Sequence, residues 1–422
     1  MNTNDMSQKD SAGELNAGGL FRNQTFLTLF GIGALQSVTR WLELLAFGVY
    51  IFDLTGSAWQ VTLVTLVKFA PLAIFGPLFG ALPNRFASRS LYIAGIVAML
   101  LTNVLGLLLA TFSTLSAFAV LMISFIGGLF WVLDFPVRRA LIGDAVEREQ
   151  LGRAMAIDTI ANNGTRMLGP VLGGILLQFV GLSGAFAIAL IIYALCLWLT
   201  FSLTSGRELT VSGDTHNDQR LSRIVTSGGQ LVMQQPLLLA ILLVTVIYNL
   251  FAFPMLSLVA VIGRDALQLS QGQVGLLVSM EGTGAFVGSL LFMMMARVID
   301  YRRLYTGGLL IAFLASMAYA FMDYALPTAV LLLIVGIGSA SFATMQTTLL
   351  ILNSEQQFRS RLFGLLSLSI GTGLIGFAQI GIQAHLYGAR LAIYISAVMG
   401  LVSLLAICWR WPQIIADQSY QE

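Results

Sequence analysis

The sequence predicts an all-α membrane protein whose twelve transmembrane helices form two pseudo-symmetric six-helix bundles. Hydrophobic residues make up 57% of its 422 residues, charged residues only 10%, and the mean hydropathy is +0.85, which is far from a soluble domain. The stretches 167–206, 224–263 and 324–354 contain no charged residue, and about 20 apolar residues suffice for one span. The third observation is an internal repeat.

The repeat relates residues 54–95 to residues 267–308 at a constant offset of 213, about half of the chain. Identical residues include Leu54, Ser57, Gln60, Arg89, Tyr92 and Gly95, which align with Leu267, Ser270, Gln273, Arg302, Tyr305 and Gly308. Lys68 falls opposite Glu281, so the copies differ where a charge interrupts an apolar run. Repeated halves are typical of secondary transporters, whose substrate site lies between the repeats.

The spans follow from apolar runs bounded by Gly, Pro, Asn or charged clusters. We expect the first six at 26–52, 59–82, 90–111, 114–137, 152–178 and 183–204. The second six are expected at 236–262, 271–296, 304–322, 327–350, 361–385 and 389–410, with a bend at Pro254. All must be helical, because each backbone amide in hydrocarbon needs a partner within its own segment. Gly76 with Gly80, and Gly284 with Gly288, predict close helix approaches.

Arginine predicts the orientation and the domains. Alternate loops carry most of it: Arg85, Arg89; Arg138, Arg139, Arg148, Arg153; Arg207, Arg220, Arg223; Arg297, Arg302, Arg303; Arg359, Arg361. The opposite loops hold only Arg264 and Arg390. An excess of arginine is typical of cytoplasmic loops. We therefore expect a bacterial inner-membrane protein with a cytoplasmic tail (1–22), an N-terminal bundle (23–204), a cytoplasmic linker (205–235), a C-terminal bundle (236–410) and a cytoplasmic C-terminal tail (411–422).

Several function classes are disfavoured by composition. Cys196 and Cys408 are isolated in apolar runs, which argues against a disulfide framework or a metal site. A net charge of +2 is too small to indicate nucleic-acid binding. The only lysines, Lys9 and Lys68, follow no phosphate-binding glycine-rich loop, which excludes a nucleotide-driven pump. We expect a monomer without cofactor or metal, whose partners are the lipid bilayer, protons and a small-molecule substrate.

Three short segments resemble the major facilitator superfamily, in particular its drug-exporter-like branch, which also contains siderophore and macrolide exporters. They are Gly80-Ala81-Leu82-Pro83-Asn84-Arg85-Phe86-Ala87-Ser88-Arg89, Leu54-Thr55-Gly56-Ser57, and Arg166-Met167-Leu168-Gly169-Pro170 with Gly173 and Gly174. Asn84 stands where that family usually has Asp, which weakens the expected charge contacts of this loop. The resemblance implies a gating role for Gly80, Asn84, Arg85, Arg89, Arg302 and Arg303. It also implies proton-coupled export by alternating access, and so multidrug efflux or siderophore release.

Charged residues within the spans are the candidate site. A charge at a helix centre costs about 2.5 to 3.5 kcal/mol, so these groups should face a hydrated cavity or each other. We assign proton coupling to Glu43, Asp134 and Asp158, and substrate binding to Arg40, Lys68, Arg166, Glu281, Tyr248 and Asn249. The alternative is a set of structural salt bridges, which is about as plausible as function for Lys68 and Asp158.

Glu43 is the preferred proton carrier. Burial favours the neutral form of the Glu43 carboxyl group, whereas the nearby Arg40 favours its charged form. The balance between the two forms can therefore change as the cavity opens from one side to the other. Three intramembrane cations, Arg40, Lys68 and Arg166, further suggest an anionic or amphipathic substrate.

Other interpretations remain open. A related transporter of lysophospholipid or another lipid is the alternative within transport, and a channel or receptor is a further one. Gly181-Leu182-Ser183-Gly184 matches the short pattern of intramembrane serine proteases, with His385 as a conceivable base. The match is weak in a chain with 42 glycines, and we expect no enzyme.

Overall fold

The computed structural model describes residues 20, 22–81, 88–112, 114–202, 232–295, 300–355 and 358–415, and these contain helices and no strand. The first half holds α3 (Gln24–Thr55), α4 (Ala58–Ala81), α5 (Ser88–Thr111), α6 (Ala117–Ala145), α7 (Arg148–Val180) and α8 (Leu182–Ser202). The second half holds α12 (Gln271–Met295), α13 (Tyr301–Tyr319), α14 (Ala325–Leu352) and α17 (Ala389–Arg410), besides two interrupted spans. The all-helical fold class is confirmed.

The interrupted spans are the seventh and the eleventh. The seventh runs through α10 (Pro236–Ile247), the π-helix η2 (Tyr248–Ala252), the 3₁₀ helix η3 (Phe253–Leu258), α11 (Val259–Val261) and the π-helix η4 (Ile262–Ala266). Pro254 explains the change at η3, because it has no amide hydrogen for the ladder. The eleventh span, predicted as continuous, divides at Thr372 into α15 (Arg359–Gly371) and α16 (Gly373–Tyr387). A short 3₁₀ helix, η6 (Pro412–Ile414), follows α17.

Nine segments among the described residues are long and apolar enough to cross a membrane. The other three predicted spans are α3, α7 and α13, which are also helical. α3 and α7 are the longest, with 32 and 33 residues, and they carry four of the intramembrane charges, Arg40, Glu43, Asp158 and Arg166. These charges lower the mean hydropathy where the candidate site lies.

Local residues explain where the helices begin and end. The Asn23 side chain accepts from the Phe26 amide at 3.0 Å and so caps α3, and the Ser116 hydroxyl caps α6 in the same way. Gly56, Gly181 and Gly388 have positive φ of 64°, 73° and 82°, which only glycine adopts at little cost. They form the tight turns α3–α4, α7–α8 and α16–α17. We call the end of the molecule that holds these turns the short-loop end, and the opposite end the arginine-rich end.

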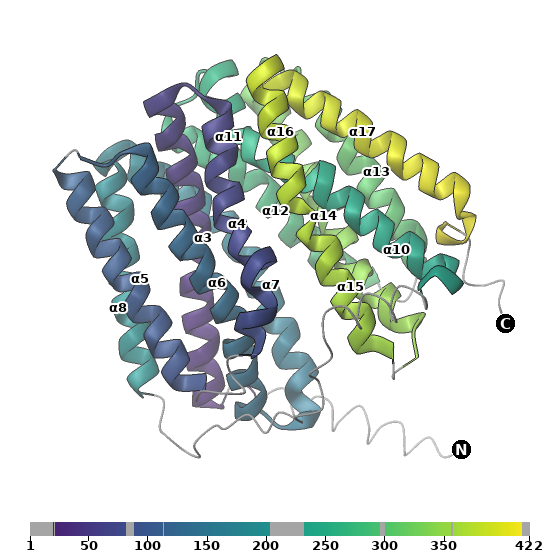
Figure 1. Cartoon of the computed structure of the whole chain (residues 1–422), viewed down its shortest axis with the longest axis horizontal. Coiled ribbons are helices and arrows are strands. Elements are labelled where there is room, and N and C mark those ends of the chain that lie inside the picture. Colours follow the sequence, from purple (N-terminus) through teal and green to yellow (C-terminus); the bar gives the residue numbers. More distant parts are fainter. Residues whose placement is uncertain are drawn as a thin grey trace.

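The helices pack in two equivalent sets. In the first half α3 packs on α7, α4 on α6 and α5 on α8; in the second half η2 packs on α16, α12 on α14 and α13 on α17. Between the halves α7 packs on α12 and α4 on α16, which are equivalent pairs under the same repeat. Figure 1 shows the first half in purple to teal and the second in green to yellow, side by side. The packing is therefore pseudo-symmetric, as the repeat predicts.

Glycines in α7 allow this helix to contact both halves closely. A Cβ on Gly173 would lie 2.6 Å from the Leu42 carbonyl oxygen in α3, whereas one on Gly174 would lie 2.9 Å from Gly275 Cα in α12. The glycine-rich stretch after Arg166 thus joins α3 within the first half and α12 across the interface.

The close approaches predicted at the paired glycines are found in one of the two pairs. Gly284 and Gly288 of α12 both lie close to α14, because a Cβ on either would come within 3.1 Å of that helix. A Cβ on Gly76 of α4 would meet no described atom within 4 Å. The predicted close approach is therefore not found at Gly76 among the described residues, and the surroundings of Gly80 lie outside them.

Candidate functional site

A cavity lies between the two halves. It holds about 750 Å³ not filled by atoms, including the part open to solvent. Its walls come from α3, α4 and α7 of the first half and from η3, α11, α12 and α16 of the second. Most lining groups are apolar, so the cavity suits a molecule with a large hydrophobic surface.

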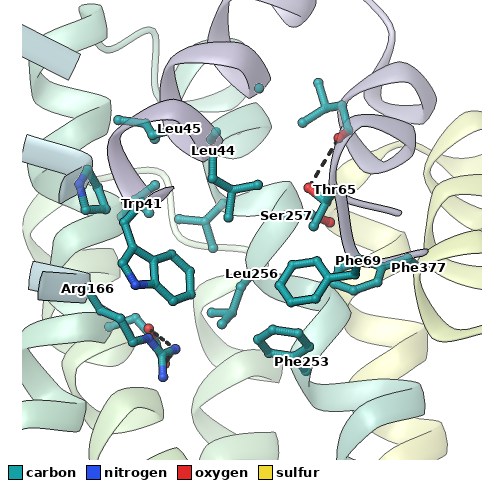
Figure 2. Close-up of a pocket in the computed structure, with 17 residues that line it drawn as sticks. Trp41, Leu44, Leu45, Thr65, Phe69, Arg166, Phe253, Leu256, Ser257 and Phe377 are labelled. Atoms are coloured by element: carbon teal, nitrogen blue, oxygen red, sulfur yellow. Dashed lines mark hydrogen bonds and ion pairs between the residues drawn. The ribbon is translucent and has the colours of Figure 1, made fainter. Parts of the chain in front are cut away.

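Aromatic side chains from both halves form one wall. Phe69 of α4 lies 5.4 Å from Phe253 of η3 and 5.6 Å from Phe377 of α16 between ring centroids. Trp41 of α3 lies on the opposite side of the cavity, next to Arg166 of α7 (Figure 2). A flat apolar molecule placed between these walls would contact both halves at once.

One ion pair bridges the halves at this cavity. Arg166 Nη2 donates to both carboxylate oxygens of Glu281 in α12, each at 2.8 Å. The two side chains are 16% and 7% exposed. The Arg166 guanidinium also lies 5.1 Å from the centroid of the Trp41 ring, within range of a cation–π contact. Of the residues predicted to bind substrate, the structure places Arg166 and Glu281 in the cavity wall.

The other predicted charges form a network inside the first half. Lys68 Nζ lies 3.2 Å from Glu43 Oε2, and Arg40 Nη2 lies 3.5 Å from Asp134 Oδ2. Asp134 also lies 3.7 Å from the Arg138 guanidinium, which is ion-paired with Asp158. Four helices contribute: α3, α4, α6 and α7. Glu43 therefore pairs with a residue of α4. Arg40 pairs with a residue of α6 rather than with Glu43 on its own helix.

The three cations that suggest an anionic substrate in the sequence each have a carboxylate partner in the structure. Arg40 pairs with Asp134, Lys68 with Glu43 and Arg166 with Glu281. This pairing removes the charge argument for an anionic substrate. One oxygen, Glu43 Oε1, is buried without a hydrogen-bond partner among the described residues.

Three polar residues of α7 are spaced by four and contact three different helices: Asp158, Asn162 and Arg166. Asp158 pairs with Arg138, Asn162 accepts from the Ser37 hydroxyl at 3.0 Å, and Arg166 pairs with Glu281. A helical spacing of four places such groups near one face. Their partners nevertheless belong to α6, α3 and α12.

Tyr248 and Asn249 lie in η2, next to the cavity but outside its lining. The Tyr248 ring stacks on Phe342 with centroids 4.0 Å apart. Asn249 Nδ2 donates to the Thr245 carbonyl of its own span at 2.9 Å. Both side chains are buried and serve packing in this conformation.

Two of the residues implied in gating, Arg89 and Arg302, occupy equivalent positions of the two halves. Arg89 Nη2 donates to the Phe201 carbonyl at 3.3 Å, and Arg302 Nη1 donates to the Gln413 carbonyl at 3.1 Å. Each arginine thus joins the third span to the end of the sixth within its own half. Arg303 is exposed beside Asp300, Gly80 lies in the last turn of α4, and Asn84 and Arg85 lie outside the described residues.

Polar contacts join the halves at the short-loop end. Asp53 of α3 accepts from Arg264 Nε of η4 and from Gln271 Nε2 of α12, both at 2.8 Å. We call Asp53, Arg264 and Gln271 the latch. Gln178 of α7 accepts from the Gly272 amide at 2.9 Å beside it. With the close glycine contact between α7 and α12, the latch closes this end of the interface.

Ser183 does not have the environment of a nucleophile. Its hydroxyl donates to the Val180 carbonyl at 3.0 Å in the α7–α8 turn of the first half. His385 belongs to α16 of the second half and lines an outer hollow with Asp265.

Sequence reasoning missed the aromatic lining and the latch. Trp41 and Phe69 directly follow Arg40 and Lys68, so an aromatic neighbour of a charge within a span was the available signal. Phe253 and Phe377 had no comparable signal, because apolar residues in a span are common. Asp53 and Arg264 looked like ordinary loop charges.

Comparisons with known proteins agree with this architecture. A family model described as transmembrane secretion effector, of the major facilitator type, matches residues 17–420. Macrolide efflux protein A of Streptococcus pyogenes is 22% identical over 268 residues, which is 63% of this chain and 65% of that protein. The match thus spans just under two thirds of that relative's length.

Solved structures share the fold. A bacterial homolog of the human lysosomal transporter Spinster, in an inward-facing and unoccupied conformation, superimposes with a TM-score of 0.72 at 15% identity, covering 93% of this chain and 98% of that one. The nucleoside transporter NupG also gives a TM-score of 0.72, at 12% identity, covering 91% and 99%. At these identities the likeness concerns the fold alone.

Proposed function

Because the chain belongs to the transmembrane secretion effector family of major facilitator transporters, we propose that it is a secondary active exporter of a small amphipathic molecule. The cavity between the halves carries this proposal. Both halves line it, and the Arg166–Glu281 ion pair crosses it. A site built from both repeats is exposed to each side in turn when one bundle rocks against the other.

The present conformation corresponds to one step of that cycle. The latch and the α7–α12 glycines close the short-loop end. With the arginine-rich end in the cytoplasm, this state is closed towards the outside, and substrate would enter from the cell interior or the inner leaflet. Export then requires that the latch open and the arginine-rich ends approach.

The substrate is expected to be apolar over most of its surface. The aromatic wall favours such a body, and the cations near the cavity are neutralised by carboxylates. A drug-like molecule fits this description, as does a hydrophobic metabolite. The efflux relative, whose name refers to macrolides, points in the same direction.

Uptake by inverted membrane vesicles tests the proposed export. In inverted vesicles the cytoplasmic face of the membrane is outside, so export from the cell becomes uptake into the vesicle. Vesicles containing the protein should therefore accumulate a neutral lipophilic dye when their interior is acidified. A protonophore should abolish the accumulation. Equal dye uptake by vesicles without the protein, or electrical conductance in place of saturable transport, would argue against an exporter.

Glu43 is proposed as the proton carrier. Its carboxylate pairs with Lys68 through Oε2, and Oε1 has no partner among the described residues. Protonation would release Lys68 and alter the α3–α4 contact. We expect Glu43→Gln, which cannot change its charge, to lose uptake driven by the pH gradient while keeping dye exchange down a dye gradient. Lys68 is left without its partner, but lysine, unlike arginine, can lose its proton.

Gln36→Leu is the matched control, because it removes a buried polar group from the same helix but no titratable charge. Gln36 accepts from the Tyr92 hydroxyl at 2.9 Å. This variant should retain its response to the pH gradient. If Glu43→Gln is still driven fully by the gradient, proton coupling belongs to another residue.

A further inference from the structure

Two hydrogen-bond donors in the cavity wall have no acceptor among the described residues. They are the indole Nε1 of Trp41 and the guanidinium Nε of Arg166. The guanidinium carbon lies 5.1 Å from the Trp41 ring centroid, so the two donors belong to one corner of the cavity. Figure 2 shows both side chains together, opposite Phe69, Phe253 and Phe377.

These donors differ from the other polar groups of the cavity. Arg166 Nη2 is already used by both Glu281 oxygens. The Ser257 hydroxyl donates to the Pro254 carbonyl at 2.7 Å and the Thr65 hydroxyl to the Val61 carbonyl at 3.5 Å, each within its own span. A buried donor without an acceptor is unfavourable and rare in native structures. Both donor atoms are buried in this conformation, so a ligand oxygen that removes this cost has to enter between the Trp41 and Arg166 side chains.

The remaining wall defines the rest of the ligand. Phe69, Phe253 and Phe377 offer aromatic faces with centroid separations of 5.4 to 5.6 Å. Glu281 neutralises Arg166, so the corner carries donors but no net charge. A carboxylate ligand would have to compete with Glu281, and an ammonium ligand would meet donors rather than acceptors.

We propose that the cavity selects neutral aromatic or other apolar molecules that present a carbonyl or comparable oxygen acceptor, and that the Trp41 N–H is the specificity-determining donor. The inference rests on the proposed function, since it names the substrate class of the same cavity. It assigns Trp41 two roles, an apolar surface and a directed hydrogen bond.

Binding of three matched probes tests this inference on the full chain in lipid nanodiscs. The first is para-dibenzoylbenzene, a neutral diketone; the second is para-dibenzylbenzene, in which methylenes replace both carbonyls; the third is benzoylbenzoate, an anionic ketone. Radiolabelled diketone is bound to wild-type protein, the other probes compete, and binding to empty nanodiscs is subtracted. The diketone should bind saturably and more tightly than either competitor.

Trp41→Phe supplies the decisive variant, because it keeps an aromatic ring and removes the N–H. We expect about tenfold weaker binding of the diketone, which corresponds to about 1.4 kcal/mol, and little change for dibenzylbenzene. Trp409→Phe is the control; Trp409 is 85% exposed on α17, away from the cavity, and its replacement should change neither probe.

Three results would overturn the inference: equal weakening of both neutral probes in Trp41→Phe, tighter binding of benzoylbenzoate than of the diketone, or no saturable diketone binding to the wild-type protein. Failure of the proposed function is a different outcome. In that case the diketone binds with the predicted dependence on Trp41, but vesicles containing the protein do not transport it.

Discussion

Replacing Glu281 with glutamine is expected to lower the free energy of unfolding by about 3 to 5 kcal/mol and to abolish most transport. Glu281 is buried and accepts two bonds from Arg166 across the interface between the halves. Without the carboxylate, the guanidinium remains in an apolar cavity with no counter-charge. Denaturant unfolding of the purified protein and dye uptake by inverted vesicles measure the two effects.

A double variant separates stability from function. Arg166→Met combined with Glu281→Leu leaves no unpaired charge, and replacing a buried ion pair by apolar groups of similar size is often neutral. We expect this variant to recover most of the lost stability but not transport, because the cavity has then lost the Arg166 donor and the ion pair that joins the halves, although the Trp41 N–H remains. Asp323→Asn is the control. Asp323 is 72% exposed and pairs with Arg390, and such surface pairs contribute about 0 to 1 kcal/mol. A Glu281→Gln protein as stable and active as this control would refute the assignment.

Replacing Gly275 with valine is expected to open the short-loop end. A Cβ at Gly275 would lie 2.5 Å from the Pro170 carbonyl oxygen and 3.1 Å from Gly174 Cα in α7. Both are backbone atoms, so no side-chain rotation relieves the contact and the two helices must separate. The population should therefore shift from the state with a closed short-loop end towards a state open at that end, with impaired transport.

Spin labels at Phe179 in α7 and Tyr387 in α16 report the separation, since both positions are exposed and belong to different halves. Their distance distribution should move to longer values in Gly275→Val and by a smaller amount in Gly275→Ala. Gly307→Val is the matched control, because a Cβ at Gly307 would meet no described atom within 4 Å. Unchanged distances in Gly275→Val, in protein that elutes as a folded species, would show that the α7–α12 contact does not hold this end closed.

The candidate site was predictable in kind but incompletely in detail. A charge stands out in an apolar run, which is why Arg40, Glu43, Lys68, Arg166 and Glu281 can be picked out from the sequence. The aromatic wall cannot, because a phenylalanine in a span carries no local sign of whether it faces lipid, a neighbouring helix or a cavity. The latch escapes for a related reason: Asp53 and Arg264 are ordinary interfacial charges until their helices meet.

The sequence by itself determined the fold class, the positions of the spans, the internal repeat and the set of charges that need partners. Hydropathy and an internal repeat can be read along the chain without knowing which segments meet in space. Only the tertiary structure decided which charges meet. Glu43 pairs with Lys68 rather than with Arg40, and Arg166 reaches across the halves to Glu281. Such pairings depend on how each helix is rotated about its axis and how far it is shifted against its neighbours. Those two quantities are fixed by packing among helices distant in sequence, including the glycine contacts of α7 with α3 and α12.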